Sequence, residues 1–562
     1  MTVPNGDVAR ACHVIDASGA ADLLDDALRT DPRGRRRALP IRTFLIGALL
    51  TVQHDRQLTI SAIHHTLTEE LSRTWQWELG VLRRDAGTAR DQRTVTLPRS
   101  QLYQLTKTMN AKLNHTPETE PDLDETERQR RHAAIEAFAE ALLEATLPPA
   151  RSRARAIDGS GIWAWARGKR VRKSGRDGAN EGGAAFPQEA NVPDEDPATA
   201  DSAVQLQAAL TGAPHDRDAR WGVKTSKSGT DEIYFGYELH GIVRVHDRHA
   251  PPDNEPTLVE RFALTPAAID IVEPTLAMLD SALAAGHPIE EVVVDRHYSY
   301  KTPERWGNEL RRRGIAQHLD LHPNEQGFRD YNGAKLAAGW LHCPGTPDRL
   351  GSIPRPAANA PDEEHDAFAE AIAERQQYGF RRVESHRASD GRARWECPAV
   401  AGTVGCPLRQ GSVEVAQQLG LPIVANPPEA ATAPACCTQQ TVSTKADAQP
   451  KLAQPHYWGS PEWRAAYNRR SYVEGAFGNL KNASAENVRR GFFRLTGLGP
   501  VTVLMAVAIA ACNIRQLRNW HERTGLGDPD HPLLAPDDDD HGFVHLTAQQ
   551  AADLDAQHSS AA

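Results

Sequence analysis

A short apolar segment that ends in an aspartate, EEVVVD at residues 290–295, most constrains the fold of this chain. Consecutive valines without polar alternation are typical of a strand buried on both faces at the centre of a sheet. Asp295 ends this segment, where an ionised carboxylate costs free energy unless it is paired or binds a cation. The segment therefore predicts an α/β domain with a carboxylate of functional importance at the end of a central strand.

The segments around this strand follow a definite order. Amphipathic helices are predicted at 265–286, where Thr265 and Pro266 give a start signal, and at 302–314. Residues 168–222, rich in Gly, Ala, Pro and Asp, have no clear period and predict a long mobile loop. Three meandering strands followed by helix–strand units indicate a mixed sheet flanked by helices. The further strands, rich in β-branched and aromatic residues, are predicted at 153–168, 233–247, 257–264 and 315–322.

A chain of 562 residues is too long for one ordinary core, so we expect several domains. The α/β domain comprises residues 151–322 and 461–522, interrupted by an inserted subdomain at 323–460. This insertion holds five of the seven cysteines and one predicted helix, DEEHDAFAEAIAERQQYG at 362–379. Residues 1–112 are predicted to be helical, which suits a small DNA-binding domain or, equally, a plain helical bundle. The remaining segments are a linker and helix at 113–150 and an acidic, disordered tail at 523–562.

The sequence indicates a cytoplasmic protein. The N-terminus lacks a basic segment followed by an apolar run, so no export signal is visible. The apolar run at 501–512 is too short to span a bilayer and predicts a buried helix. Seven cysteines without an export signal indicate reduced thiols, and no membrane partner is expected.

Charge by itself leaves the partner open. The net charge of −10 argues against nucleic acid, but much of the acid lies in the tail and in one loop. Attraction to DNA depends on a local basic surface, whereas clusters of arginine can equally be solvated faces. These clusters lie at 33–37, 151–155, 167–173, 311–313 and 489–490.

The segment YNRRSYVEGAFGNLKN at 467–482 predicts one helix with a charged stripe. On a helical wheel Tyr467, Arg470, Glu474 and Lys481 fall within about 60° of one another, beside an apolar flank. One carboxylate among two cations and a phenol suits a metal ion bound beside a polyanion. The alternative is a surface helix with an ion pair between Arg470 and Glu474.

Two distant aspartates favour the metal interpretation. Asp158 lies in the predicted strand AIDGSG, and Asp295 ends the buried strand. If these strands are neighbours and the helix packs on their sheet, Glu474 joins both aspartates. Three converging carboxylates repel one another and require Mg²⁺ or Mn²⁺. Two such ions can clamp the attacking and leaving oxygens of a phosphodiester.

These motifs resemble a known family. The spacing Y-x₂-R-x₃-E-x₆-K, present from Tyr467 to Lys481, resembles the signature of one large branch of bacterial insertion-sequence transposases of the DDE class, which have a ribonuclease H-like catalytic domain. AIDGSG and VVVDRHYSY resemble the segments around the first and second aspartates of the family, with Tyr298 three residues after Asp295. The resemblance covers roughly residues 150–320 and 460–520 and implies an insertion before Glu474.

The resemblance implies a role for each matching residue. Asp158, Asp295 and Glu474 would be the catalytic residues and would hold two Mg²⁺ or Mn²⁺ ions. The implied activity cleaves phosphodiester bonds at the inverted-repeat ends and joins the 3′-hydroxyl ends to target DNA. The partners are double-stranded DNA and a second copy of the chain, and residues 1–112 would bind the DNA ends. The residues expected to contact terminal phosphates are Tyr467, Arg470 and Lys481.

Three further residues of the α/β domain are candidates around the site. The family often stacks a flipped base on an aromatic residue, and Trp306 and Trp463 are both candidates for that role. His297 is bulkier than the small residue expected after Asp295, so it is either neutral to function or crowds the metal site.

The insertion carries a possible structural zinc site. Cys343, Cys397, Cys406 and Cys437 could supply thiolate ligands, with His342 and Cys436 beside them. The spacing contains no C-x₂-C pair, so unpaired thiols are the alternative.

Two other functions remain open. A metal-dependent nuclease or resolvase on the same fold would cut DNA without joining it. A DNA-binding protein derived from a transposase would bind without cutting. Ser160 beside Asp158 has no evident His–carboxylate pair, so serine chemistry is not expected.

Overall fold

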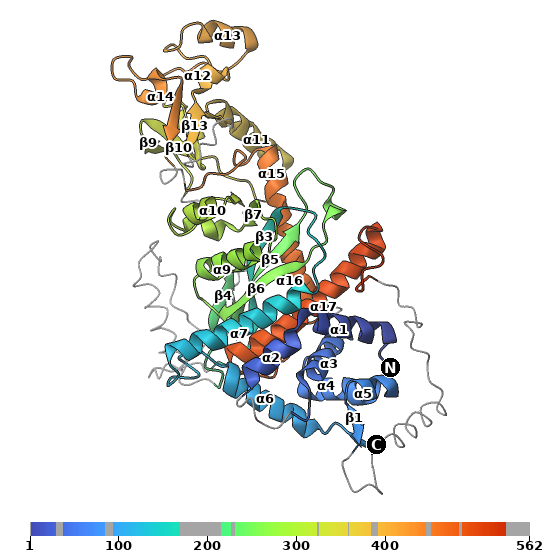
Figure 1. Cartoon of the computed structure of the whole chain (residues 1–562). Coiled ribbons are helices and arrows are strands. Elements are labelled where there is room, and N and C mark those ends of the chain that lie inside the picture. The colour runs from blue at the N-terminus through green and yellow to red at the C-terminus, as the bar shows by residue number, and fades with distance from the viewer. Residues whose placement is uncertain are drawn as a thin grey trace, which may run out of the picture.

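The computed structural model describes residues 2–29, 37–84, 94–168, 215–225, 231–322, 325–357, 359–383, 392–445, 451–482 and 486–534. Figure 1 shows three regions in a row, with the N-terminal helices at one end, a sheet in the middle and the inserted residues at the other end. The protein is mixed α/β, as predicted, with helices and mixed sheets.

A mixed sheet occupies the middle of the molecule. Its strands lie in the order β4-β5-β3-β7-β8, and β6 pairs with the second half of β5. The strands β3, β7 and β8 are parallel, whereas β4, β5 and β6 pair antiparallel. The bounds are β3 Ala154–Trp163, β4 Arg220–Thr225, β5 Asp231–Val245, β6 Val259–Pro266, β7 Glu291–Val294 and β8 Ala316–Leu319.

Both faces of this sheet are covered, as predicted. Val292, Val293 and Val294 of β7 are fully buried, which confirms a central strand. On one face Val292 and Val294 share a core with α9 (Val272–Ala284) and α10 (Gly307–Arg312). On the other face Val293 lies toward the side covered by α7 (Glu125–Glu144), α16 (Ser471–Lys481) and α17 (Leu498–Thr524). The alternation of side chains along each strand produces these two separate cores.

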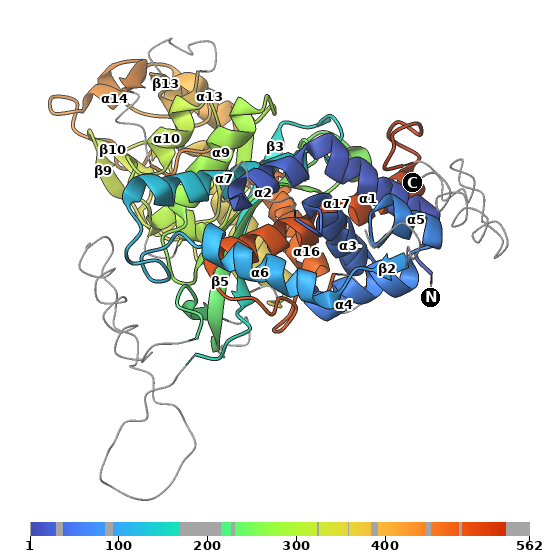
Figure 2. The same ribbon diagram turned by 60° about the horizontal axis from the view of Figure 1, so that its bottom comes forward.

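The N-terminal residues are helical, with one short hairpin. Their apolar side chains belong to the same core as α7, α17 and one face of the sheet, so this core crosses the boundary predicted at residue 112. Figure 2 shows α3 and α6 beside α17, and α1 beside α3. The elements are α1 Asn5–Ser18, α2 Ala20–Leu28, α3 Ile41–Gln53, α4 Ile60–His65, the π-helical turn η1 Thr66–Glu70, α5 Arg73–Glu78, β1 Leu82–Arg84, β2 Thr94–Thr96 and α6 Arg99–Leu113.

The helix α17 extends beyond the apolar run 501–512 at both ends. It has 27 residues and is, among the described residues, the one helix that is long and apolar enough to cross a membrane. However, 89% of its apolar window is buried inside the protein. This burial is what the core helix of a soluble protein shows, so the prediction of a buried helix is confirmed.

The insertion contains two three-stranded sheets and several short helices. The predicted helix is present as α11, Asp362–Gln377. One sheet has the order β11-β10-β9 and the other β12-β13-β14, and all pairs are antiparallel. The other elements are β9 Arg329–Tyr331, β10 Ala334–Ala337, β11 Trp340–His342, β12 Arg381–Arg382, β13 Ala393–Glu396, α12 Pro398–Ala401, α13 Ser412–Leu419, α14 Ala435–Thr438 and β14 Thr441–Thr444.

Three local predictions differ from the structure. Thr265 and Pro266 end β6 instead of starting a helix, and α9 begins only at Val272. The predicted loop 168–222 lies mostly outside the described residues, but its end forms β4, because those residues pair with β5. The first part of the predicted tail packs against α17, with Leu533 fully buried, and residues 535–562 lie outside the described residues.

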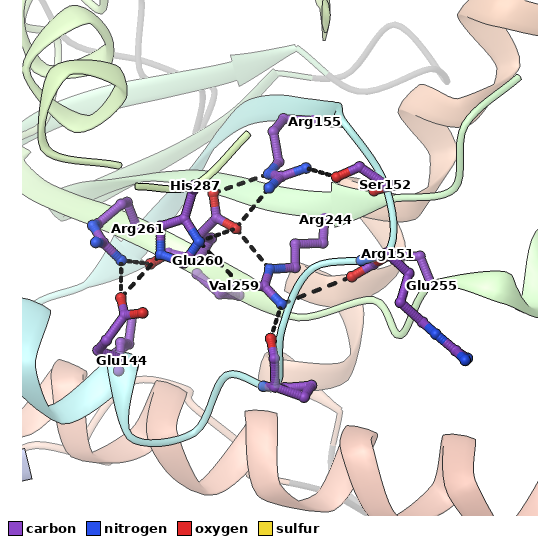
Figure 3. A network of polar contacts seen from close by, with 12 residues as sticks. Glu144, Arg151, Ser152, Arg155, Arg244, Glu255, Val259, Glu260, Arg261 and His287 are labelled. Atoms are coloured by element: carbon purple, nitrogen blue, oxygen red, sulfur yellow. Dashed lines mark hydrogen bonds and ion pairs between the residues drawn. The ribbon is translucent and has the colours of Figure 1, made fainter. Parts of the chain in front are cut away.

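A buried charge network joins three strands on the face of the sheet that carries α9. Arg155 of β3 lies directly opposite Arg244 of β5, and like charges at such a position repel. The register of β5 and β6 shifts between Ile242 and Val243, which leaves Glu260 as an extra residue. Figure 3 shows Glu260 between the two guanidinium groups, with Arg155 Nε 2.9 Å and Arg244 Nε 2.6 Å from its carboxylate.

Candidate active site

The register of two parallel strands brings Asp158 and Asp295 together. Ile157 of β3 is the partner of Val294 of β7, and each aspartate directly follows its member of this pair along the chain. The strand β7 ends at Val294, whereas β3 continues to Trp163. Asp158 is therefore the first residue of β3 that has no partner on β7. Asp295 Oδ1 accepts the Arg296 N–H at 2.6 Å and caps the turn that follows.

The charged segment 467–482 is not one continuous helix, which corrects the prediction. Tyr467 ends α15 (Pro461–Tyr467), Arg470 ends the 3₁₀ turn η6 (Asn468–Arg470), and Glu474 and Lys481 lie on α16. The turn is held by Arg469, a buried side chain that donates to Glu291 and to the carbonyls of two residues. The predicted apolar flank is confirmed, because Ala466, Val473, Phe477 and Leu480 are all buried.

Arg470 connects two of the three carboxylates. It donates from Nη1 to Asp158 Oδ2 at 2.8 Å and from Nη2 to Glu474 Oε1 at 2.5 Å. Burial raises the pKa of Asp158 to about 6, Arg470 and the Gly159 N–H oppose this rise, and the charges of Asp295 and Glu474 add to it. The three carboxylates are thus close enough to repel one another, and one guanidinium balances part of their charge.

The other two residues of the stripe lie on either side of Arg470. Lys481 Nζ donates to Ser160 Oγ at 2.7 Å and to the Gly161 carbonyl at 2.6 Å, two to three residues beyond Asp158 on β3. The ring of Tyr467 stacks on Trp463 at 4.8 Å between centroids. Burial raises the pKa of Tyr467, as do the charges of Asp320 and Asp295, whereas Arg470 lowers it. The structure therefore brings all six predicted residues into one region.

A glycine allows the helix that carries Glu474 to lie close to the sheet. Gly241 of β5 is the partner of Asp158, and a Cβ added there would lie 3.0 Å from Phe477 Cζ of α16. We expect Gly241→Val to displace α16, to cost about 1–3 kcal/mol of unfolding free energy by overpacking, and to separate Glu474 from Asp158. Chemical denaturation measures the first effect and DNA cleavage the second.

The matched control for this change is Gly475→Ala in α16, where an added Cβ meets nothing within 4 Å. This control is expected to keep or raise stability by up to about 1 kcal/mol, because alanine favours helix over glycine. If Gly241→Val unfolds at the same denaturant concentration as the parent protein, the close approach of α16 to Gly241 does not contribute to stability.

Neither tryptophan predicted to stack on a flipped base is available for that role. Trp306 is buried, packs against the ring of Tyr298 at a tilt of 39° and donates to Gln317 Oε1 at 3.0 Å. Trp463 is also buried and donates to Gln454 Oε1 at 3.0 Å. Both side chains are part of the core, and an internal acceptor for each indole N–H makes this burial possible.

His297 and Tyr298 follow Asp295 but differ in role. His297 lies at the surface, and desolvation of its ring and the charge of Lys301 lower its pKa. The imidazole is therefore neutral near pH 7 and adds no positive charge beside Asp295. Tyr298 is buried, and its hydroxyl lies 2.8 Å from Thr275 Oγ1 of α9. Tyr298 thus anchors the turn after Asp295.

A fourth carboxylate near the site was missed from the sequence. Glu238 of β5 is the partner of Gly161, and burial raises its pKa, with Asp158 adding to the rise and Lys481 opposing it. His240 lies two residues along the same strand and donates to or accepts from Thr265 Oγ1 at 3.0 Å. No signal in the sequence sets these two residues apart, because the same segment 233–247 also contains Arg244, His246 and Asp247.

Two cation–aromatic pairs beside the site were also missed. Arg490 lies 6.0 Å from the ring of Trp163, and Arg494 lies 5.2 Å from the ring of Trp165. Trp165 is 44% exposed, so its ring is accessible from solvent. These pairs continue the surface from β3 beyond Lys481. Residues so far apart along the chain give no local signal, so the sequence could not have joined them.

The carboxylates suit a hard divalent cation by their chemistry. Oxygen ligands from Asp and Glu are those that Mg²⁺ and Mn²⁺ prefer. Among the described residues, however, no group of three or more His, Cys, Asp or Glu side chains is already arranged to hold a metal ion. The Arg470 guanidinium takes the place between Asp158 and Glu474, so metal binding requires it to leave at least one of them.

No protein-family model, no curated protein and no solved structure matches the sequence. We therefore interpret this site from the residues of this chain alone.

Proposed function

We propose that this protein is a DNA transposase of the DDE class with a ribonuclease H-like catalytic domain. The single observation that supports this most is the meeting of Asp158 and Glu474 on one guanidinium, with Asp295 on the adjacent strand. Residues from three distant segments, each matching a motif of the family, come together at one point of the sheet. The mixed order of antiparallel and parallel strands supports the same assignment.

Each residue has a role in this proposal. Asp158, Asp295 and Glu474 would hold two divalent cations, which supply charge neutralisation and water activation at a phosphodiester when they are bound. Arg470 can turn from the carboxylates to phosphate oxygens, because its planar fork suits both. Lys481 contributes a point charge beside β3. The hydroxyl of Tyr467 orients the DNA end.

The surface beside α16 leaves room for a DNA strand. A Cβ added at Gly475 or Gly478 would meet nothing within 4 Å. Packing within the described protein therefore does not require these glycines, although each costs helix stability of up to about 1 kcal/mol. Close approach of a ligand backbone to the helix is a physical reason for such glycines.

An arginine-lined cleft supports a polyanionic partner. It has a volume of about 2080 Å³ and lies between the α/β part and the insertion. It opens at the amino ends of β7 and β8, away from Asp295, so DNA would contact the protein at more than one place. Burial and the like charge of Arg382 lower the pKa of Arg311. The cleft is lined by eight arginines, Arg153, Arg248, Arg311, Arg312, Arg381, Arg382, Arg392 and Arg394, and by the acids Asp247, Glu290, Glu291 and Glu462.

The decisive experiment incubates the full chain with a labelled duplex and a supercoiled target plasmid in Mg²⁺. The duplex carries the terminal inverted repeats found in the DNA that flanks the coding region. A product in which the labelled 3′ end is joined to the plasmid supports a transposase. Cleavage without joining identifies a nuclease or resolvase, and binding without cleavage identifies a non-catalytic DNA-binding protein. A cytoplasmic location and a dimer in the end complex stay predictions.

Arg470→Ala is expected to weaken binding of the end duplex by roughly 10–100-fold, the range for loss of a charged hydrogen bond. The salt dependence of binding should become flatter by about one unit in the slope of log K against log salt, because one phosphate contact is lost. Binding across a salt series, measured by fluorescence anisotropy, checks both values.

The control is Arg464→Ala, which removes an exposed arginine from the neighbouring helix α15. General electrostatic attraction predicts equal losses for the two variants. The proposed phosphate contact predicts a larger loss for Arg470→Ala, and equal losses would contradict it.

A further inference from the structure

The insertion gathers five cysteines from separate segments of the chain. Cys343 follows β11, Cys397 follows β13, Cys406 precedes α13, and Cys436 and Cys437 lie in α14. All five are buried and none forms a disulfide. Buried free thiols usually act as small apolar groups, so their gathering in one subdomain calls for a separate reason.

Backbone contacts bring these segments together. The Cys397 N–H donates to the Gln440 carbonyl at 3.0 Å, which joins the end of β13 to the residues after α14. Arg409, three residues after Cys406, donates to the Gln439 carbonyl. Gly405 pairs with Ile423. The turn after Cys343 reaches the residue that follows Ile423, because a Cβ at Gly345 would overlap Val424.

The thiols are close enough to act on one another. Burial raises the pKa of the Cys343 thiol to about 12, and the neighbouring Cys437, Cys397 and Cys406 add to the rise. Burial also raises the pKa of Cys406, again with contributions from Cys397 and Cys437. Four side chains from four segments thus face a common region, where four thiolates repel one another unless a cation joins them.

Three of these cysteines share a local sequence feature. Each is followed by proline, as Cys343-Pro344, Cys397-Pro398 and Cys406-Pro407. In two of the turns a backbone N–H two residues later points at the sulfur, from Gly345 to Cys343 and from Leu408 to Cys406, and lowers the thiol pKa. A hydrogen bond to sulfur favours the thiolate, which is the form that binds metal. Such donors are the outer-shell contacts that orient metal ligands.

The adjacent pair in α14 contributes one ligand. A hydrogen bond from Cys436 to Cys437 lowers the pKa of Cys437 and raises that of Cys436. Cys437 is the member of the pair that neighbours both Cys343 and Cys406, so we take it as the ligand. His342 has other neighbours: its Nε2 lies 2.6 Å from the Tyr457 hydroxyl, and burial and the charge of Arg375 lower the pKa of its ring.

We infer that Cys343, Cys397, Cys406 and Cys437 bind one structural zinc ion that holds the insertion together. Soft thiolates in a closed set of four suit tetrahedral zinc without an open position. Each ligating thiol releases its proton to solvent as it binds. The side chains must rotate toward a common point, because no three such groups among the described residues already stand as metal ligands. This inference does not depend on the proposed transposase activity.

The first test measures metal in the full chain, purified under reducing conditions without added zinc or chelator. Mass spectrometry of the metal content is expected to give about one zinc per chain. Chelation of this zinc should expose four additional thiols to Ellman's reagent, and Co²⁺ added to the stripped protein should produce a sulfur-to-cobalt absorption band. A zinc-free protein that shows no such band with Co²⁺ overturns the inference, even if it cleaves DNA.

The second test compares single substitutions in the full chain. Cys397→Ser is expected to lose zinc and to lower the melting temperature of the insertion. Cys436→Ser, in the residue that donates to Cys437, and Cys12→Ser, in the distant helix α1, are expected to keep one zinc per chain. If Cys397→Ser keeps its zinc, the ligand assignment is wrong. Should Cys397→Ser not fold, the metal content and Co²⁺ spectrum of the parent protein still decide.

Discussion

Glu474→Gln is expected to reduce DNA cleavage on the order of 10³-fold, while the affinity for the DNA end changes little. The substitution keeps the size and hydrogen-bonding shape of the side chain but removes one of three carboxylate charges proposed to hold divalent cations. Arg470 and Lys481, the cations proposed to contact DNA, remain in place. Single-turnover cleavage of a labelled end measures the rate, and fluorescence anisotropy measures the affinity.

The matched control for this change is Glu273→Gln, which removes an exposed carboxylate from α9. It should cleave at the parental rate, because Glu273 lies on a helix that covers the sheet and not in the site. A Glu474→Gln protein that nicks DNA as fast as the parent would remove Glu474 from the catalytic set. A loss of binding equal to the loss of cleavage would assign it to DNA binding instead.

Glu260→Gln is expected to destabilise the fold by about 3–5 kcal/mol, the cost of removing one partner from a buried charge network. The guanidinium groups of Arg155 and Arg244 are fully buried, with 0% and 1% of their side chains exposed, and both bind Glu260. Glutamine cannot neutralise them, and like charges directly opposite on paired strands repel. Urea denaturation, followed by circular dichroism, measures the change against Glu304→Gln, whose exposed carboxylate should matter by less than about 0.5 kcal/mol.

The dependence of this effect on pH has a definite sign. Burial raises the pKa of Glu260, but Arg155 and Arg244 outweigh burial and lower it from the ordinary 4.5 to about 2. A group with a lowered folded pKa stabilises fully above its unfolded pKa and loses that contribution as the pH falls through the folded value. The difference in stability between parent and Glu260→Gln should therefore be constant above about pH 4.5 and shrink toward pH 2. A difference that stays constant across this window would show that charge is not its cause.

Much of the α/β part was predictable because its signals are local. The valines before Asp295 are buried on both faces, and a strand with that composition has no other stable place than the middle of a sheet. The helix α11 was also predictable from a local signal, because its residues lie between turn residues and repeat with the period of a helix. The start of α9 was missed because Pro266 also fits the end of an edge strand.

The site was predictable in its members but not in its arrangement. The wheel of 467–482 placed four residues on one side, and they do lie near each other, although a 3₁₀ turn separates Tyr467 from Glu474. That turn is made by the contact of Arg469 with Glu291, a residue far away in the sequence. Glu238 and Trp165 were overlooked because their place beside the site depends on neighbours from other segments, Asp158 and Lys481 for Glu238 and Arg494 for Trp165.

By itself the sequence determined which carboxylates end or interrupt apolar strands and which residues form the apolar flank of the segment 467–482, because both follow from burial and from fixed periods of two and 3.6 residues. Only the tertiary structure decided that β7 stops beside Asp158, that Gly241 lets α16 approach, and that Arg470 lies between Asp158 and Glu474. These contacts join residues that lie far apart along the chain. Their energies depend on distance and desolvation in space, and no local pattern carries that information.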